Sequence, residues 1–383
     1  MPQVAIPLAG EANRFSPDAC RRLIVKVGSA LLVSARGEPH AEWVETLVAD
    51  VAARIEAGQQ VAIVSSGAIA LGARRLGLPG GGRASLEDAQ AAAAAGQIAL
   101  AHMWSDLLSA RGLVAAQVLV TLDDLEDRRR YLNASATLNR LLNLGVVPVI
   151  NENDSVATAE IRFGDNDRLA ARVAQAAGAQ GVLLLSDIDG LYDSNPHGNP
   201  DARFIPLVER IDAAIEAMAD GRSASGMGSG GMVSKVEAAR IAAGAGIDLA
   251  IVSGRVPHAL ARFAETGRGT VFLGERGSSA RKAWIAGGLT SGGTIRVDAG
   301  AARALKSGTS LLPAGVTSVE GSFHRGDVVE IVGPDGKRLA RGLSEYDAAE
   351  ARLIVGRRSE QLAEVLGHEP RSALVHRNHM ALV

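Results

Sequence analysis

Long apolar runs alternate with helix-patterned segments along this chain, and few folds accommodate that alternation. The runs RRLIVKVGSALL (21–32), VVPVINEND (146–154) and GVLLLSDIDGLY (181–192) stay apolar until they reach polar ends. Helix-patterned segments lie between such runs, for example 86–111 and 232–244. A strand with one exposed face alternates apolar and polar residues, whereas a strand buried on both faces does not. The pattern therefore predicts an α/β fold, an open and mostly parallel sheet sandwiched by helices.

Polar residues end most of the predicted strands. They are Gly28-Ser29, Ser66-Gly67, Asn151 to Asp154, Ser186-Asp187 and Ser253-Gly254. The carboxyl ends of parallel strands share one edge of a sheet, and ligands bind there in open α/β folds. We therefore expect a ligand site at this edge, although simple turns would also use these residue types.

Composition and charge narrow the class of protein. The 383 residues are 47% hydrophobic and 21% charged, which is typical of a globular chain of about two domains. The net charge of −2 gives no general attraction to nucleic acid or membranes. Cys20 is the single cysteine, so no internal disulfide is possible. Residues 1–20 lack a secretory signal, and we expect a flexible N-terminal extension, no membrane span and a cytoplasmic protein.

A change of character marks a second domain. Residues 278–289 are rich in glycine, serine and charge, and we read them as a linker after a main domain at 21–277. Short strand-like pieces follow, including GDVVEIVG (326–333) and RLIVG (352–356), with a hairpin turn at Asp335-Gly336. Only AGAARALKSG is helix-patterned there. We predict a small, mostly β domain over 290–368 and a C-terminal tail over 369–383.

The segment GMGSGGMVSK (226–235) spells GxGxxG, but its context disfavours a nicotinamide site. A dinucleotide-binding turn follows a strand, whereas the polar segment EAMADGRSAS precedes this one. Asp248 precedes the next strand instead of ending it. The chain also lacks a GxxxxGK[ST] phosphate-binding loop. A glycine-rich entry to a helix still suits an anion, and Lys235 lies one turn inside that helix. An ordinary surface loop is the alternative reading.

Charged groups from distant segments complete the pattern. Lys26 lies inside an apolar strand, and a lysine is rarely buried without a partner. Asp165, Asn166 and Asp167 lie at a loop–helix junction, where a helix cap explains one of them but not all three. Two lysines and free backbone N–H groups suit phosphoryl transfer, in which catalysis is positioning and charge neutralisation. The carboxylates could orient the lysines, hold Mg²⁺ or bind an amine of the acceptor.

Several long motifs resemble the amino acid kinase family, in the form found in its glutamate 5-kinase branch. They are IVKVGS, VSSGAIALG, INENDSVAT, FGDND, LLLSDIDGLY and SGMGSGGMVSKVEAA, in order over roughly 22–275. Residues 290–368 resemble a PUA domain. Serine stands at 65, 186 and 229 where threonine is more usual, which keeps the hydroxyl.

The resemblance implies ATP-dependent phosphorylation of the γ-carboxylate of L-glutamate, the first step of proline biosynthesis. It also implies feedback inhibition by proline, a homo-oligomer (dimer or tetramer), and Mg²⁺ held mainly by the phosphates of ATP. The matching motifs imply that the catalytic residues are Lys26, Lys235, Asp165 and Asp167. They imply that glutamate is bound by Ser66, Gly67, Asn151, Asp154 and Asn166. They imply that ATP is bound by Lys26, Ser186, Asp187, Ser229, Gly230, Gly231, Met232, Val233, Ser234 and Lys235.

Two other classes of function stay open at this point. Another amino acid kinase would act on aspartate, acetylglutamate or a nucleoside monophosphate. An RNA-binding protein would use the PUA-like part, since 281–383 holds 14 basic against 11 acidic residues. Its aromatic candidates for stacking are Trp284, Phe323 and Tyr346. A metal site at His376 and His379 is disfavoured because two ligands are too few.

Overall fold

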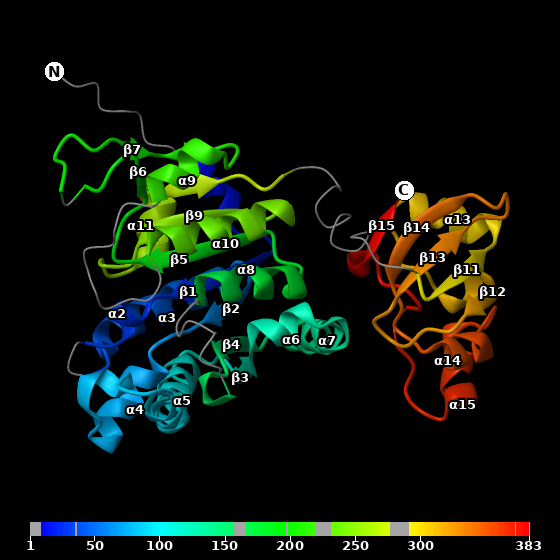
Figure 1. Ribbon diagram of the computed structural model, residues 1–383, viewed down its shortest axis with the longest axis horizontal. Helices are drawn as coiled ribbons and strands as arrows, with labels where there is room; N and C mark the ends of the chain where they lie inside the picture. The colour runs from blue at the N-terminus through cyan, green and yellow to red at the C-terminus, as the bar shows by residue number, and fades with distance from the viewer. Residues whose placement is uncertain are drawn as a thin grey trace. The chain divides into compact units, whose positions relative to one another are not determined.

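The computed structural model describes residues 9–34, 37–156, 166–196, 198–219, 231–275, 291–371 and 373–382. The chain divides into two compact units (Figure 1). The first comprises Met1–Leu125 and Ala134–Glu275, and the second comprises Glu126–Asn133 and Arg276–Val383. The linker predicted at 278–289 lies outside the described residues.

An eight-stranded sheet forms the centre of the first unit, in the order β3-β4-β2-β1-β5-β9-β10-β8. Its strands are β1 (Arg22–Val27), β2 (Gln60–Val64), β3 (Ala115–Val120), β4 (Val147–Glu152), β5 (Gly181–Ser186), β8 (Leu207–Val208), β9 (Asp248–Ser253) and β10 (Thr270–Phe272). All neighbours pair in parallel except β9 and β10, which are antiparallel. Both β4 and β5 are buried along their whole length. The predicted mostly parallel α/β sheet is confirmed.

Helices cover both faces of this sheet (Figure 1). The helices in this part of the chain are α1 (Ala9–Ala12), α2 (Ser29–Leu32), α3 (Ala41–Glu56), α4 (Ala68–Leu76), α5 (Leu86–Ser109), α6 (Leu122–Glu126), α7 (Arg128–Asn143), α8 (Asn166–Ala177), α9 (Ala213–Ala219), α10 (Met232–Gly244) and α11 (Ala259–Thr266). The end of α6 and the start of α7 belong to the segment Glu126–Asn133 of the second unit. Leu23, Val25 and Val27 of β1 join the core made with α3 and α11. Successive side chains of a strand point to opposite faces. Ile24 and Lys26 therefore face the other layer, where α8 packs on β1 and α10 packs on α8.

Short elements in the first unit were not predicted. The hairpin of β6 (Leu191–Tyr192) and β7 (Phe204–Ile205) follows β5, and β8 and β10 extend the sheet. Strands of two or three residues are too short for a periodic pattern to be recognised. Within the described ranges, the unit also has 3₁₀ turns at Asn13–Phe15, Pro79–Gly82 and Asp154–Val156.

The N-terminal extension differs from the expectation. Phe15 and Cys20 are fully buried, and Phe15 packs edge-to-face on Phe263 of α11 with ring centroids 5.8 Å apart. The prediction of a flexible leader is therefore wrong for residues 9–20, because burying these apolar side chains offsets the entropy lost on ordering them. Residues 1–8 lie outside the described part of the chain.

The second unit carries a five-stranded sheet in the order β12-β11-β13-β14-β15. Its strands are β11 (Gly293–Val297), β12 (Val316–Gly321), β13 (Val328–Val332), β14 (Arg338–Leu343) and β15 (Met380–Leu382), and its helices are α13 (Ala299–Lys306), α14 (Ala348–Leu353) and α15 (Leu362–Leu366). The hairpin at Asp335-Gly336 is confirmed, since β13 and β14 pair antiparallel across it. The C-terminal segment predicted as a tail supplies β15.

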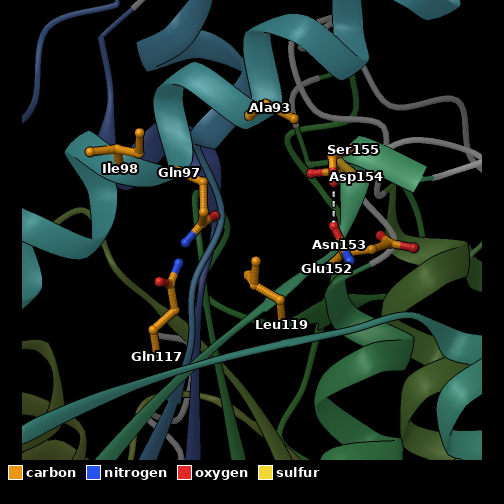
Figure 2. Close-up of a pocket in the computed structure, with 10 residues that line it drawn as sticks. Ala93, Gln97, Ile98, Gln117, Leu119, Glu152, Asn153, Asp154 and Ser155 are labelled. Carbon is orange, nitrogen blue, oxygen red and sulfur yellow. Dashed lines mark hydrogen bonds between the residues drawn. The ribbon is translucent and has the colours of Figure 1, made fainter.

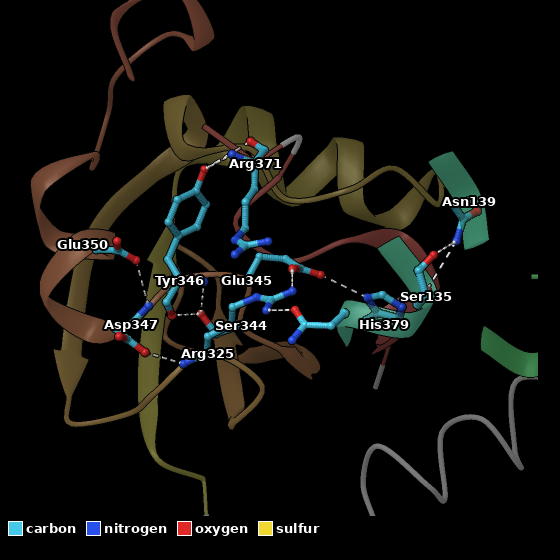
Figure 3. Close-up of polar contacts among 11 residues, drawn as sticks. Ser135, Asn139, Arg325, Ser344, Glu345, Tyr346, Asp347, Glu350, Arg371 and His379 are labelled. Carbon is cyan, nitrogen blue, oxygen red and sulfur yellow. Dashed lines mark hydrogen bonds and ion pairs between the residues drawn. The ribbon is translucent and has the colours of Figure 1, made fainter. Parts of the chain in front are cut away.

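The strand predicted at 352–356 is wrong. A capping box at Asp347 and Glu350 starts helix α14, which runs through Leu353. Ile354 caps the C-terminus of this helix through a backbone hydrogen bond to Glu350, and residues 354–356 form the turn that follows, so no strand ladder is made there. Alongside the loop that carries Asp347, Figure 3 shows a buried polar cluster, in which Glu345 lies 3.2 Å from His379 and 3.6 Å from Arg325. Among the residues described, no helix is both long and apolar enough to cross a bilayer.

Candidate active site

Two buried lysines share one buried carboxylate at the carboxyl edge of the large sheet. The Nζ atom of Lys26 lies 2.5 Å from Oδ1 of Asp167, and Nζ of Lys235 lies 3.0 Å from Oδ2. Lys26 comes from β1, Asp167 from the first turn of α8, and Lys235 from the first turn of α10. The predicted convergence of the two lysines is therefore confirmed. It follows from the face on which Lys26 points, since that face is covered by α8 and α10.

The charge balance of this group favours an anion. Burial alone would raise the pKa of the Asp167 carboxyl, but the Lys26 and Lys235 ammonium groups outweigh burial and hold the pKa at about 2. The carboxyl is therefore ionised at neutral pH. Among the described residues, this group brings two ammonium groups and one carboxylate together in a buried place. A phosphate group would accept charge-assisted hydrogen bonds from the ammonium groups.

The N-terminus of α10 adds backbone donors beside Lys235. Gly231 is the N-cap residue, with φ −69° and ψ −173°, and as a glycine it has no side chain with which to cap this end. The first N–H groups of a helix have no intrahelical acceptor, and the helix dipole favours an anion there. Met232, Val233, Ser234 and Lys235 form this first turn, as expected for the ATP-binding residues. Ser229 and Gly230 lie outside the described residues, as does Asp165.

The ends of β5 and β9 lie side by side at the same edge. Ser186 pairs in register with Ser253, and its hydroxyl donates to Oδ1 of Asp187 at 3.1 Å. Oδ2 of Asp187 lies 3.9 Å from the guanidinium of Arg255 in the loop after β9. The two predicted ATP-site residues of β5 are thus at the lysine-bearing edge of the sheet.

A second polar group, formed by Ser66, Asn151 and Asn166, joins β2, β4 and α8. The Nδ2 atom of Asn166 donates to Oγ of Ser66 at 2.9 Å and to Oδ1 of Asn151 at 3.3 Å. All three side chains are buried. Asn166 directly precedes Asp167, so this network borders the lysine group. Three residues predicted to bind the acceptor are brought together.

Gly67 makes the turn from Ser66 into α4. Its φ of +98° lies in the left-handed region, and a Cβ there would lie 3.0 Å from Cγ2 of Val33. Glycine is the residue that adopts this conformation without strain. The turn leaves the N-terminus of α4 uncapped by any side chain, beside the Ser66 hydroxyl.

Asp154 supplies an unusual carboxyl next to this network. It begins the 3₁₀ turn after β4 and is buried, which raises its pKa to about 6 against an opposing effect of Arg83. Its Oδ1 atom and Oδ1 of Asn166 are buried and have no hydrogen-bond partner within the described part of the chain. A buried acceptor without a donor costs about 1–3 kcal/mol. A ligand that brings N–H donors would remove that cost.

A pocket of about 230 Å³ opens beside Asp154 (Figure 2). It is lined by Ala93, Ala94, Gln97, Ile98, Gln117, Leu119, Glu152, Asn153, Asp154 and Ser155. The amide of Gln97 reaches this wall from α5, and its Oε1 accepts from Nδ2 of Asn151 at 2.8 Å. Trp104, further along α5, donates to Oγ of Ser65 at 2.9 Å. Both residues were missed, because nothing in an alanine-rich helix distinguishes a side chain that contacts a site.

The carboxylates do not assemble into an obvious metal centre. No group of three or more His, Cys, Asp or Glu side chains that could hold a metal ion occurs among the residues described. Asp167 is already engaged by two ammonium groups.

Comparison with known proteins gives consistent results for both parts of the chain. The model of the amino acid kinase family matches residues 21–253, and that of the PUA domain matches 293–366. A glutamate 5-kinase of Sphingopyxis alaskensis is 67% identical over 369 residues, covering 96% of this chain and 99% of that protein. A glutamate 5-kinase of Novosphingobium aromaticivorans is 61% identical over 372 residues, covering 97% and 98% respectively. One from Zymomonas mobilis is 59% identical over 369 residues, covering 96% and 93%.

Proposed function

Because this chain belongs to the amino acid kinase family, we propose that it transfers the γ-phosphoryl group of ATP to the γ-carboxylate of L-glutamate. The products are ADP and L-glutamyl 5-phosphate, and the reaction begins proline biosynthesis. The observation that carries the proposal is the pair of buried ammonium groups on Asp167 beside a network with unpaired acceptors. The two ammonium groups suit the phosphates of ATP, and the unpaired acceptors suit the ammonium group of an amino acid.

The donor side of the site has to overcome repulsion between anions. Two unit charges about 4 Å apart interact by on the order of 4 kcal/mol at the effective dielectric near a protein surface. Lys26, Lys235 and the N-terminus of α10 offset this repulsion and hold the phosphates in line with the acceptor. A carboxylate oxygen of glutamate attacks the γ-phosphorus, and the bond from phosphorus to the β–γ bridging oxygen breaks.

No general base is required for this transfer, because the attacking carboxylate is already ionised. Asp167 also suits a base poorly, since its pKa of about 2 leaves it little affinity for a proton. We assign Asp167 to holding the two lysines at a fixed separation. Asp165, which lies outside the described residues, remains a predicted participant.

The part of the site that we assign to the acceptor distinguishes free amino acids from N-acylated amino acids. We assign the unpaired Oδ1 atoms of Asp154 and Asn166 to the α-ammonium group of glutamate. The Ser66 hydroxyl, which accepts from Asn166, keeps its own hydrogen to donate to a carboxylate. Acetylglutamate has no ammonium group to satisfy these acceptors, which favours glutamate over it.

We propose that ATP binds as its complex with Mg²⁺. When bound, Mg²⁺ neutralises charge on the β- and γ-phosphates. As the family resemblance implies, we assign its ligands mainly to phosphate oxygens.

Three further properties are proposed from the family resemblance. They are inhibition by proline bound near the glutamate site, a cytoplasmic location and a homo-oligomer. The sheet supports the last, since β3 stands at one end of it and Ile98, Val114 and Leu119 near that edge are exposed apolar side chains. Light scattering and titration with proline test the first and last of these directly.

Acceptor specificity tests the central proposal. ADP release is measured with ATP, Mg²⁺ and, in turn, L-glutamate, L-aspartate, N-acetyl-L-glutamate and UMP. We expect release with glutamate and its suppression by proline. Release with another acceptor but not with glutamate would replace the proposal by the corresponding kinase.

The alternative of RNA binding through the PUA domain loses part of its support. Phe323 and Tyr346, two candidates for stacking on bases, are buried in the core of the second unit. Trp284 lies outside the described residues. A salt-dependent titration of the whole chain with RNA tests what remains of this alternative, because binding to phosphates weakens steeply with salt.

A further inference from the structure

We infer that Gln97 is a positioning residue for the acceptor site, because it fixes the orientation of the Asn166 amide through Asn151. The inference rests on the proposed function and adds a residue that the motifs did not indicate. Gln97 lies on α5, lines the pocket beside Asp154, and is linked to Asn166 through the side-chain amide of Asn151.

The hydrogen bonds that link Asn166, Asn151 and Gln97 are all donated in the same direction, from Asn166 toward Gln97. Oε1 of Gln97 accepts from Nδ2 of Asn151 at 2.8 Å. The other end of the Asn151 amide, its Oδ1, accepts from Nδ2 of Asn166 at 3.3 Å. Because an amide presents oxygen on one side and nitrogen on the other, the acceptor on Gln97 determines which side Asn151 turns toward Asn166.

Asn166 is left with only one group for a ligand. Its Nδ2 carries two hydrogens, and these are directed to Asn151 and to Oγ of Ser66. Its Oδ1 is buried and has no hydrogen-bond partner in the part of the chain that the structure describes. The network thus offers an oxygen to the acceptor, which suits an ammonium group. A reversed Asn166 amide would offer N–H groups there and would repel it.

Close helix packing keeps Gln97 at a fixed position. A Cβ at Gly96 would lie 1.8 Å from the carbonyl oxygen of Ala68, and one at Gly72 would lie 1.7 Å from that of Ala92. The backbones of α4 and α5 are therefore in direct contact beside Gln97. Trp104 lies two turns further along α5 and holds Ser65, next to Ser66. One rigid helix thus supports the network from two points.

The test compares two substitutions of similar size. Gln97→Leu removes the acceptor, whereas Gln97→Glu keeps oxygen acceptors for Asn151. We expect Gln97→Leu to raise the glutamate KM about tenfold, the loss typical of one buried hydrogen bond, and to leave the ATP KM within about twofold. We expect Gln97→Glu to recover most of the affinity for glutamate.

A ligand without the amino group separates positioning from general damage. Glutarate is glutamate without its ammonium group and is used as a competitive inhibitor. Since the inference concerns the ammonium contact, the inhibition constant of glutarate should change less than about twofold in Gln97→Leu. His102→Leu, an exposed substitution on the same helix, serves as the matched control and should leave all constants unchanged.

The outcomes are separable from failure of the proposed function. Unchanged glutamate KM in Gln97→Leu overturns the inference. The inference is also overturned if Gln97→Leu weakens the binding of glutamate and of glutarate equally, or if Gln97→Glu does not recover the affinity for glutamate. Either result would show that Gln97 has only a structural role. If Gln97→Leu unfolds, Gln97→Ala is measured in its place under the same criteria. Absence of glutamate-dependent ADP release in the unmodified protein would instead reject the proposed function itself.

Discussion

The ammonium nitrogen of Lys235 lies 3.0 Å from Oδ2 of Asp167, although 68 positions separate the two residues in the chain. This contact joins the first turns of α10 and α8, and Lys26 of β1 takes the other carboxylate oxygen. Three elements therefore meet at one buried carboxylate. Their meeting point defines where phosphates can be held relative to the acceptor network.

Removing the shared carboxylate should destabilise the protein. In Asp167→Asn the two buried ammonium groups lose their counter-charge, and we expect the free energy of unfolding to fall by about 3–5 kcal/mol. Urea denaturation measures this change. Glu265→Gln, which breaks the exposed pair with Arg262, is the control and should cost less than about 1 kcal/mol. A loss in Asp167→Asn as small as the control's would contradict a tightly coupled buried group.

Lys235 should act on turnover more than on substrate binding. Lys235→Ala removes a positive charge that faces the transferring group, and we expect kcat to fall about 10²-fold or more. Steady-state rates of ADP formation at saturating ATP and glutamate provide the measurement. Arg240→Ala, an exposed change on the same helix, is the control. Near-normal turnover of the Lys235 variant would reject the proposed role.

Glutamate binding should weaken in mild acid. The pKa of Asp154 is raised to about 6, so its carboxylate takes up a proton as the pH falls through that value and loses its attraction for an ammonium group. We expect the glutamate KM to rise below pH 6 while the ATP KM changes little. In Asp154→Asn the glutamate KM should be high at every pH. A pH-dependent rise that persists in this variant would assign the effect to another group.

The buried carboxyl of Asp154 should also lower the free energy of unfolding at neutral and alkaline pH when no ligand is bound. Its pKa in the folded state, about 6, lies above the ordinary value of 3.8, so its favourable contribution is complete below pH 3.8 and is lost as the pH rises through 6. At pH 8 we therefore expect ligand-free Asp154→Asn to be more stable than the unmodified protein, by about 1–3 kcal/mol. Thermal unfolding at pH 8 and pH 4 tests this, and an equal gain at both pH values would argue against it.

The contact between α4 and α5 should tolerate no side chain. Gly72→Ala would place a Cβ 1.7 Å from the Ala92 carbonyl oxygen, and we expect overpacking to cost at least about 1–3 kcal/mol. Gly10→Ala is the control, because nothing lies within 4 Å of its added Cβ. Equal stability of the two variants would show that the helices separate easily.

The amino-acid sequence was sufficient for the long strands of the large sheet and for the polar residues at their ends. Buried strands such as β5 carry uninterrupted apolar runs, and helix α10 is rich in alanine, the strongest helix former, so the local sequence predicted both. Lys26 was recognisable because a lysine in an apolar strand needs a partner. The short strands β8 and β10 were not predictable, since two or three residues carry no period.

Only the tertiary structure determined which side chains from distant segments contact one another. Nothing in the local sequence states that Lys26 and Lys235 share the oxygens of Asp167, that Phe15 packs on Phe263, or that Gln97 orients Asn151. A segment's own residues determine its preference for strand or helix and the face it buries. The direction of a side-chain amide and the charge balance around a carboxylate depend instead on atoms from several segments, whose distances exist only once the chain is packed.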